Sequence, residues 1–113
     1  MKIKDAISAA DALRQNAIPE ETKYGWACAL DADIADHMEV PTQHTVFPQD
    51  AELLMPPPHD RIYVLYLCAM IDFFQNDAEM YQIDLSAYNT EKQEALSWWI
   101  RNHRPSASGD WRV

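Results

Sequence analysis

The chain has 113 residues, 48% of them hydrophobic, and contains only two glycines. This length supports one domain, and the scarcity of glycine favours helices over a turn-rich β-sandwich. The net charge of −9 disfavours direct binding to nucleic-acid phosphates, because like charges repel. We therefore expect one all-α domain over residues 1–105 and a flexible tail over residues 106–113.

Two amphipathic helices are predicted before residue 40. The first runs from Ile3 to about Gln15 and places one apolar row on a single face: Ile3, Ile7, Ala10 and Leu13. The second opens at Pro19 and ends near Val40, since Pro41 disfavours helical geometry in the residue before it. Its inward positions recur every four residues: Trp26, Leu30, Ile34 and Met38. We expect the opposite face to be acidic and solvated, with Asp31, Asp33, Asp36 and Glu39.

A proline-rich loop is predicted over residues 41–58, which hold five of the seven prolines. A loop of this length is uncommon in a small domain and is often functional or mobile. Leu53, Leu54 and Met55 are apolar residues within it. We expect them to lie against the core or a partner protein.

The stretch from Leu53 to Tyr81 contains the most apolar part of the chain. No glycine or proline occurs from Arg61 to Tyr81, which predicts one long central helix whose start is marked by Pro58 and Asp60. Two apolar rows follow from helical spacing: Ile62, Tyr66, Ala69, Phe73 and Met80 in one, and Tyr63, Leu67, Met70, Phe74 and Tyr81 in the other. A helix that is apolar on most sides is central to its domain. Either it is simply the core helix, or one row faces a neighbouring subunit.

The last predicted helix follows a turn over residues 82–86. Ser86 or Asn89 is its expected cap, and it runs to about His103, before Pro105. Its inward residues are expected to be Leu96, Trp99 and Ile100. In the tail, Trp111 is either a contact point or an exposed side chain without a role.

Catalytic patterns are weak, so we expect no enzyme, cofactor or bound metal. The histidines lack zinc-site spacing, and no glycine-rich phosphate loop is present. Asp33 and His37 lie four residues apart and could share a metal, although such a pair is more often a solvated contact. Cys28 and Cys68 are expected to act as apolar helix residues rather than as a disulfide. The first residues contain no signal-peptide pattern, which predicts a soluble protein of a reducing cytosol.

The central segment resembles a family of small tailed-phage and prophage proteins encoded among the head genes, near the capsid protein. The resemblance covers about Ile3 to Pro105 and is carried mainly by one series: Leu53, Leu54, Pro58, Asp60, Tyr63, Tyr66, Leu67, Ile71 and Asp72. The closing Trp99, Arg101, His103 and Pro105 fit as well. His59 departs from the pattern, which usually has a tyrosine before the aspartate.

That resemblance implies a helical head–tail connector, also called a head-completion or neck protein. Such proteins look like rings beneath the portal, and a ring needs side-to-side contacts that close by rotation. The expected partners are other copies, the portal and tail-side proteins, without specific nucleic-acid binding or a membrane. The expected location is the bacterial cytoplasm during assembly, and then the virion. Candidate interaction residues are Leu53, Leu54, Met55, Pro58, Tyr63, Tyr66, Phe74, Tyr81 and Trp111. The alternative is an acidic helical regulator or inhibitor that binds a nucleic-acid-handling protein.

Overall fold

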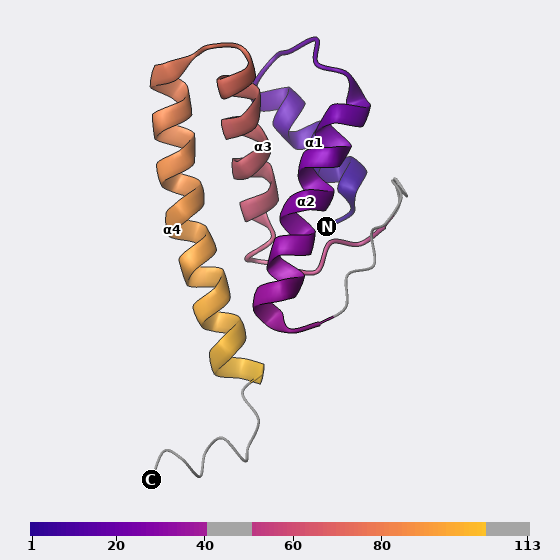
Figure 1. The fold of residues 1–113 in the computed structure, drawn as a ribbon, viewed down its shortest axis with the longest axis vertical. Coiled ribbons are helices and arrows are strands. Elements are labelled where there is room, and N and C mark those ends of the chain that lie inside the picture. Colours follow the sequence, from indigo (N-terminus) through magenta and orange to yellow (C-terminus); the bar gives the residue numbers. More distant parts are fainter. Residues whose placement is uncertain (41–50, 104–113) are drawn as a thin grey trace, which may run out of the picture.

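The computed structural model describes residues 1–40 and 51–103, which form four α-helices (Figure 1). Their bounds are Ile3–Leu13 for α1, Glu20–Met38 for α2, Arg61–Phe74 for α3 and Ala78–His103 for α4. The predicted all-α fold with four helices is confirmed. The flexible tail and most of the proline-rich loop were predicted for residues that lie outside this description. No described helix has both the length and the apolar character that a membrane span requires.

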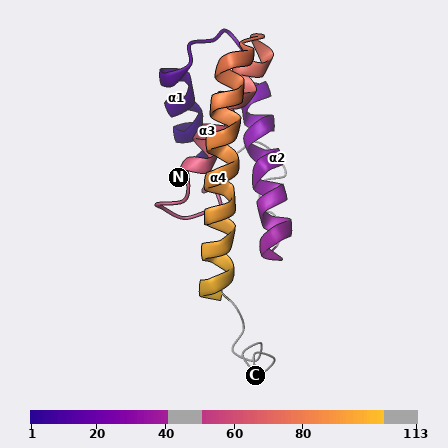
Figure 2. The same ribbon diagram turned by 90° about the vertical axis from the view of Figure 1, so that its left-hand side faces the viewer.

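Helix α3 occupies the centre of the domain, as predicted. Helix α4 lies along one side of it, and α1 and α2 lie on the other (Figures 1 and 2). Four α3 side chains are completely buried: Ile62, Tyr63, Leu67 and Ile71. Together with Ile3 and Ile7 of α1 and Ile34 of α2, they belong to one hydrophobic core.

The central helix is shorter than predicted, because it ends at Phe74 rather than near Tyr81. Asn76 has a positive φ of 60°, a conformation that asparagine tolerates better than most residues. Asp77 then begins α4, since its Oδ1 accepts a hydrogen bond from the Met80 N–H at 3.2 Å. Met80 and Tyr81 therefore belong to α4 and do not extend the rows of α3.

Helix α4 is continuous over 26 residues, so the predicted turn over residues 82–86 and the caps at Ser86 or Asn89 are wrong. The Thr90 hydroxyl instead donates to the Ser86 carbonyl at 3.1 Å, within the helix. Tyr88 is buried against the core, and this tertiary contact outweighs the weak helix propensity of the polar residues around it. Leu96 and Trp99 pack inward as predicted, but Ile100 is 48% exposed.

Two residues of the first half of the chain also differ from expectation. Leu13, at the end of α1, is 60% exposed instead of inward. Asp31 of α2 is completely buried instead of solvated. Its neighbours one helical turn away on either side, Ala27 and Ala35, are buried too, so Asp31 belongs to the inner face of α2.

Residues 51–60 are packed against the helices before α3 begins. The Leu53 N–H donates to the Met1 carbonyl at 2.9 Å, and the Ile3 N–H donates to the Ala51 carbonyl at 3.1 Å. Leu53 and Met55 are buried in the core. A turn over residues 57–60, with a cis peptide bond between Pro57 and Pro58, leads into Arg61.

Candidate interaction surface

A buried hydrogen-bond network holds the segment before α3 in place. The Tyr63 hydroxyl donates to Asp31 Oδ1 at 2.7 Å and accepts from the Met55 N–H at 2.9 Å. Asp31 Oδ1 also accepts from the Leu54 N–H at 3.0 Å. Burial and the negative charge of Asp31 raise the pKa of Tyr63, so the hydroxyl remains a donor at neutral pH. The network therefore links α2, α3 and residues 54–55.

A second buried cluster joins α1, α3 and α4 through Arg14, Asp72 and Asp84. Arg14 Nη2 lies 2.9 Å from Asp84 Oδ2, and Arg14 Nε lies 3.2 Å from Asp72 Oδ1. One guanidinium thus faces two carboxyl groups. Burial, together with the hydrogen bond and charge of Asp84, raises the pKa of Asp72 to about 7, against the opposing effect of Arg14. The folded protein therefore favours the protonated form of Asp72 more than water does.

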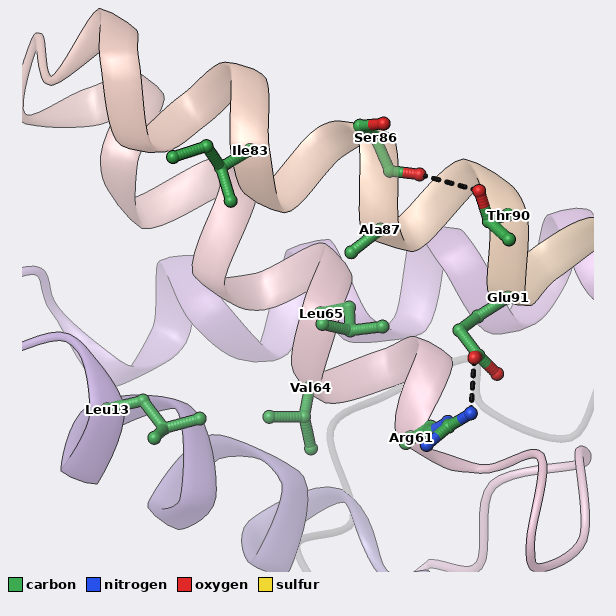
Figure 3. Close-up of a pocket in the computed structure, with 9 residues that line it drawn as sticks. All are labelled: Leu13, Arg61, Val64, Leu65, Ile83, Ser86, Ala87, Thr90 and Glu91. Atoms are coloured by element: carbon green, nitrogen blue, oxygen red, sulfur yellow. Dashed lines mark hydrogen bonds and ion pairs between the residues drawn. The ribbon is translucent and has the colours of Figure 1, made fainter.

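An apolar groove of about 690 Å³ lies between α1 and α4, with α3 as its floor (Figure 3). Val64 and Leu65 of α3 form the floor, Leu13 comes from α1, and Ile83 and Ala87 come from α4. Leu13 and Ile83 are more than half exposed, at 60% and 55%. The groove is thus an open surface whose walls are apolar, rather than an enclosed cavity.

Charged residues lie at both ends of this groove. At one end, Arg61 of α3 forms an ion pair with Glu91 of α4, far from Ile83 and Leu13 (Figure 3). At the other end, Leu13 and Ile83 each directly precede a member of the buried cluster, Arg14 and Asp84. The first pair connects α3 with α4, and the second connects the end of α1 with α4.

Exposed aromatic side chains gather where α3 meets α4. Phe73 and Phe74 are 62% and 58% exposed. The Phe73 ring lies 5.5 Å from that of Tyr81, and the Phe74 ring lies 6.0 Å from that of Trp26 on α2. Both contacts leave much of each phenylalanine in solvent. We call Phe73, Phe74 and Tyr81 the aromatic end of the domain.

The predicted interaction residues separate into an internal and an external group. Leu53, Met55 and Tyr63 are buried and contact the core of their own chain, and Leu54 is partly buried beside them. Tyr66 is half-buried against Tyr88, at 5.1 Å between ring centres. Exposed or partly exposed positions are Pro58, Phe74 and Tyr81. At the aromatic end the Tyr81 ring lies against Phe73, while the Phe74 ring lies against Trp26. Trp111 lies outside the described residues.

The candidate metal ligands and thiols can be placed in the described part of the chain. No group of three or more metal-ligating side chains is found among residues 1–40 and 51–103. Asp33 pairs with Lys92 at 2.8 Å as well as lying near His37, so this carboxylate has a structural partner on α4. Burial raises the pKa of the Cys68 thiol to about 11, which keeps it protonated and weakly nucleophilic.

Sequence reasoning did not identify the groove residues Leu13 and Ile83, nor the cluster of Arg14, Asp72 and Asp84. A sequence signal existed for Asp72, because it lies between the apolar run that ends at Ile71 and the two phenylalanines that follow. No comparable signal marks Leu13, whose spacing fits an inward face. Its exposure depends on α1 ending there, beyond the cover of α4.

Comparison of the chain with models of known protein families, with curated proteins and with solved structures gave no match.

Proposed function

We propose that the protein is a structural assembly subunit, a head–tail connector of a phage or prophage that binds other copies and the portal and tail-side proteins. The observation that carries this proposal is the amount of apolar surface left outside a complete core. Among residues 1–40 and 51–103, five large hydrophobic side chains are about half or more exposed: Leu13, Phe73, Phe74, Ile83 and Ile100.

These side chains do not serve the stability of the single domain. The core already includes fully buried residues from α1, α2, α3 and the segment before α3. Contiguous patches of large apolar groups on a protein surface mark places where another surface binds, whereas single exposed apolar side chains are ordinary. A function in protein association explains the groove and the aromatic end better than a function in catalysis.

The class of partner is supported by the sequence resemblance to neck proteins. In such an assembly each copy binds its neighbour through two different surfaces, and the contacts close into a ring. The net charge of −9 suits a ring around DNA, because an acidic channel repels the duplex and lets it move without adhering. The site of action is then the bacterial cytoplasm during particle assembly, followed by the virion.

The proposal is tested by mixing the purified protein with its cognate portal and imaging the mixture by negative-stain electron microscopy. We expect rings bound to the portal. The double variant Phe73→Asp with Phe74→Asp removes the exposed aromatic rings of α3, and it should reduce ring formation at least tenfold if that end is an interface.

The matched control is Gln82→Asp with Gln93→Asp, which adds the same charge at two exposed polar positions of α4. Far-ultraviolet circular dichroism checks that both double variants remain helical. A wild-type protein that stays unbound to portal and to tail-side proteins at every ratio overturns the proposed function.

A further inference from the structure

We propose that the groove between α1 and α4 binds the C-terminal segment, residues 104–113, of a neighbouring copy of the chain. This inference rests on the proposed assembly function and specifies one contact within it. The other exposed surfaces provide no comparable indication of their occupant.

The chemistry of the segment matches that of the groove. Its sequence, RPSASGDWRV, ends with two apolar residues, Trp111 and Val113, placed two positions apart. In an extended peptide, residues two apart face the same side, so both side chains can enter one apolar groove. Val64, Leu65, Ile83 and Ala87 supply the apolar contacts there.

Charge also favours this occupant. The last ten positions contain Arg104, Arg112 and Asp110, so their side chains have a net charge of +1, whereas the whole chain has a net charge of −9. The acidic surface of one copy repels most segments of a second copy, because both copies have the same negative net charge. A segment whose side chains have a net charge of +1 avoids that repulsion when two copies meet.

The position of the groove along α4 indicates that the segment comes from another copy. Glu91 lies 12 residues before His103, or about 18 Å along the helix, and Ile83 lies about 30 Å from the same point. A ten-residue segment spans at most about 35 Å. To fill its own groove, it would have to reverse at once after His103 and stay almost fully extended. Since α4 carries the chain away from the groove (Figure 1), binding to a second copy has no such restriction.

This arrangement gives each copy one donor and one acceptor at opposite ends of α4. Contacts between such complementary ends are heterologous, so they propagate from copy to copy until a ring closes. The groove and the terminal segment therefore supply the type of contact that the proposed function needs.

The experiment places the photo-cross-linker benzoylphenylalanine at position 83 of the full-length protein, with an equal mixture of ¹⁵N-labelled and unlabelled chains. We expect irradiation to join position 83 to a peptide from residues 105–112, with mixed-isotope products that identify two different chains. Cross-links found only within one chain overturn the proposal, and so does the absence of any cross-link to that peptide.

Substitutions test the same contact without the probe. Ile83→Glu and Trp111→Ala should each weaken self-association by at least about tenfold in sedimentation velocity, because each removes an apolar partner from the interface. The controls are Gln93→Glu, which adds the same charge at an exposed α4 position outside the groove, and Trp111→Phe, which keeps an aromatic ring; both should retain association. Equal weakening by Ile83→Glu and Gln93→Glu overturns the assignment of this contact to the groove.

The two proposals fail in different ways. Cross-links of the expected kind without rings on the portal support the contact between copies and overturn the proposed connector function. Rings on the portal without cross-links to residues 105–112 support the proposed connector function and overturn the proposed contact in the groove.

Discussion

Tyr63 is the residue on which the placement of the segment before α3 depends most. Its hydroxyl is the donor to one oxygen of a completely buried carboxylate and the acceptor for the Met55 N–H. Buried polar groups are stable only when such partners are present, and the loss of one partner leaves the other unsatisfied. The hydroxyl therefore contributes more than a surface hydrogen bond does.

Tyr63→Phe should lower the free energy of unfolding by about 2–3 kcal/mol, because Asp31 and the Met55 N–H both lose a buried partner. Urea unfolding followed by circular dichroism measures this loss. Tyr81→Phe, at a partly exposed position, is the control and should change the free energy by less than about 0.5 kcal/mol. Similar effects from the two variants would show that the network contributes little.

Asp72 makes stability depend on pH. Its pKa is raised to about 7 in the folded protein, whereas an unfolded aspartate titrates near 4. Between these two values the folded protein holds a proton that the unfolded chain has lost, so the contribution of Asp72 to stability falls as pH rises toward 7. Above about pH 7, both states are ionised and the full cost of the buried charge beside Asp84 remains.

Asp72→Asn should remove that cost, because the amide keeps a donor toward Asp84 without a negative charge. The free energy of unfolding of the variant minus that of wild type should be about 1 kcal/mol larger at pH 8 than at pH 5. This change is modest because Arg14 offsets part of the repulsion between Asp72 and Asp84. The measurement is urea unfolding of both proteins at the two pH values. If the free energies of unfolding of variant and wild type differ by the same amount at pH 5 and pH 8, the raised pKa of Asp72 is contradicted.

At the scale of elements, the boundary between α3 and α4 shows where sequence reasoning succeeded and where it stopped. The apolar run correctly predicted a central helix, because its spacing leaves no solvated face. The end of that helix was missed, since residues 75–78 contain neither glycine nor proline. The break depends on a left-handed Asn76 followed by the capping Asp77, a pair that is also compatible with an uninterrupted helix.

The C-terminal end of α2 can be stabilised by one substitution. Its cap residue, Glu39, has a φ of 58°, which is unfavourable for a residue with a Cβ atom. Glu39→Gly should raise the free energy of unfolding by about 1 kcal/mol, because glycine adopts this conformation without steric cost. Glu39→Ala is the matched control, since it removes the same charged side chain but keeps the Cβ atom. Thermal unfolding of both variants checks the prediction, which fails if alanine stabilises as much as glycine.

The candidate surface was predictable only in part. Phe74 and Tyr81 follow from the apolar rows, although helical spacing placed them on one helix rather than two. The groove depends on how α1 and α4 are spaced over α3, and that distance is set by long-range packing and by the Arg14 cluster. Spacing within one helix contains no information about a gap between two others.

At the scale of the whole molecule, charge opposes compactness. The chain has 18 acidic and nine basic residues, so the folded state brings like charges together. Raising the sodium chloride concentration from about 20 mM to about 200 mM should increase the melting temperature by a few degrees, because screening reduces this repulsion. Differential scanning calorimetry measures the shift. A lower melting temperature in salt would show that ion pairs such as Lys92 with Asp33 outweigh the net repulsion.

The C-terminal part of α4 extends well beyond the residue at which the shorter α3 begins, Arg61 (Figure 1). The first half of α4 is covered by the central helix, whereas its second half relies on contacts such as the stacking of Trp98 on His59, at 4.9 Å between ring centres. Amide protons near Tyr88 should therefore exchange with deuterated solvent only when the whole domain opens, while those near Arg101 should exchange through local fraying. Binding of another protein to the second half of α4 would then slow deuterium uptake in the last turns of this helix.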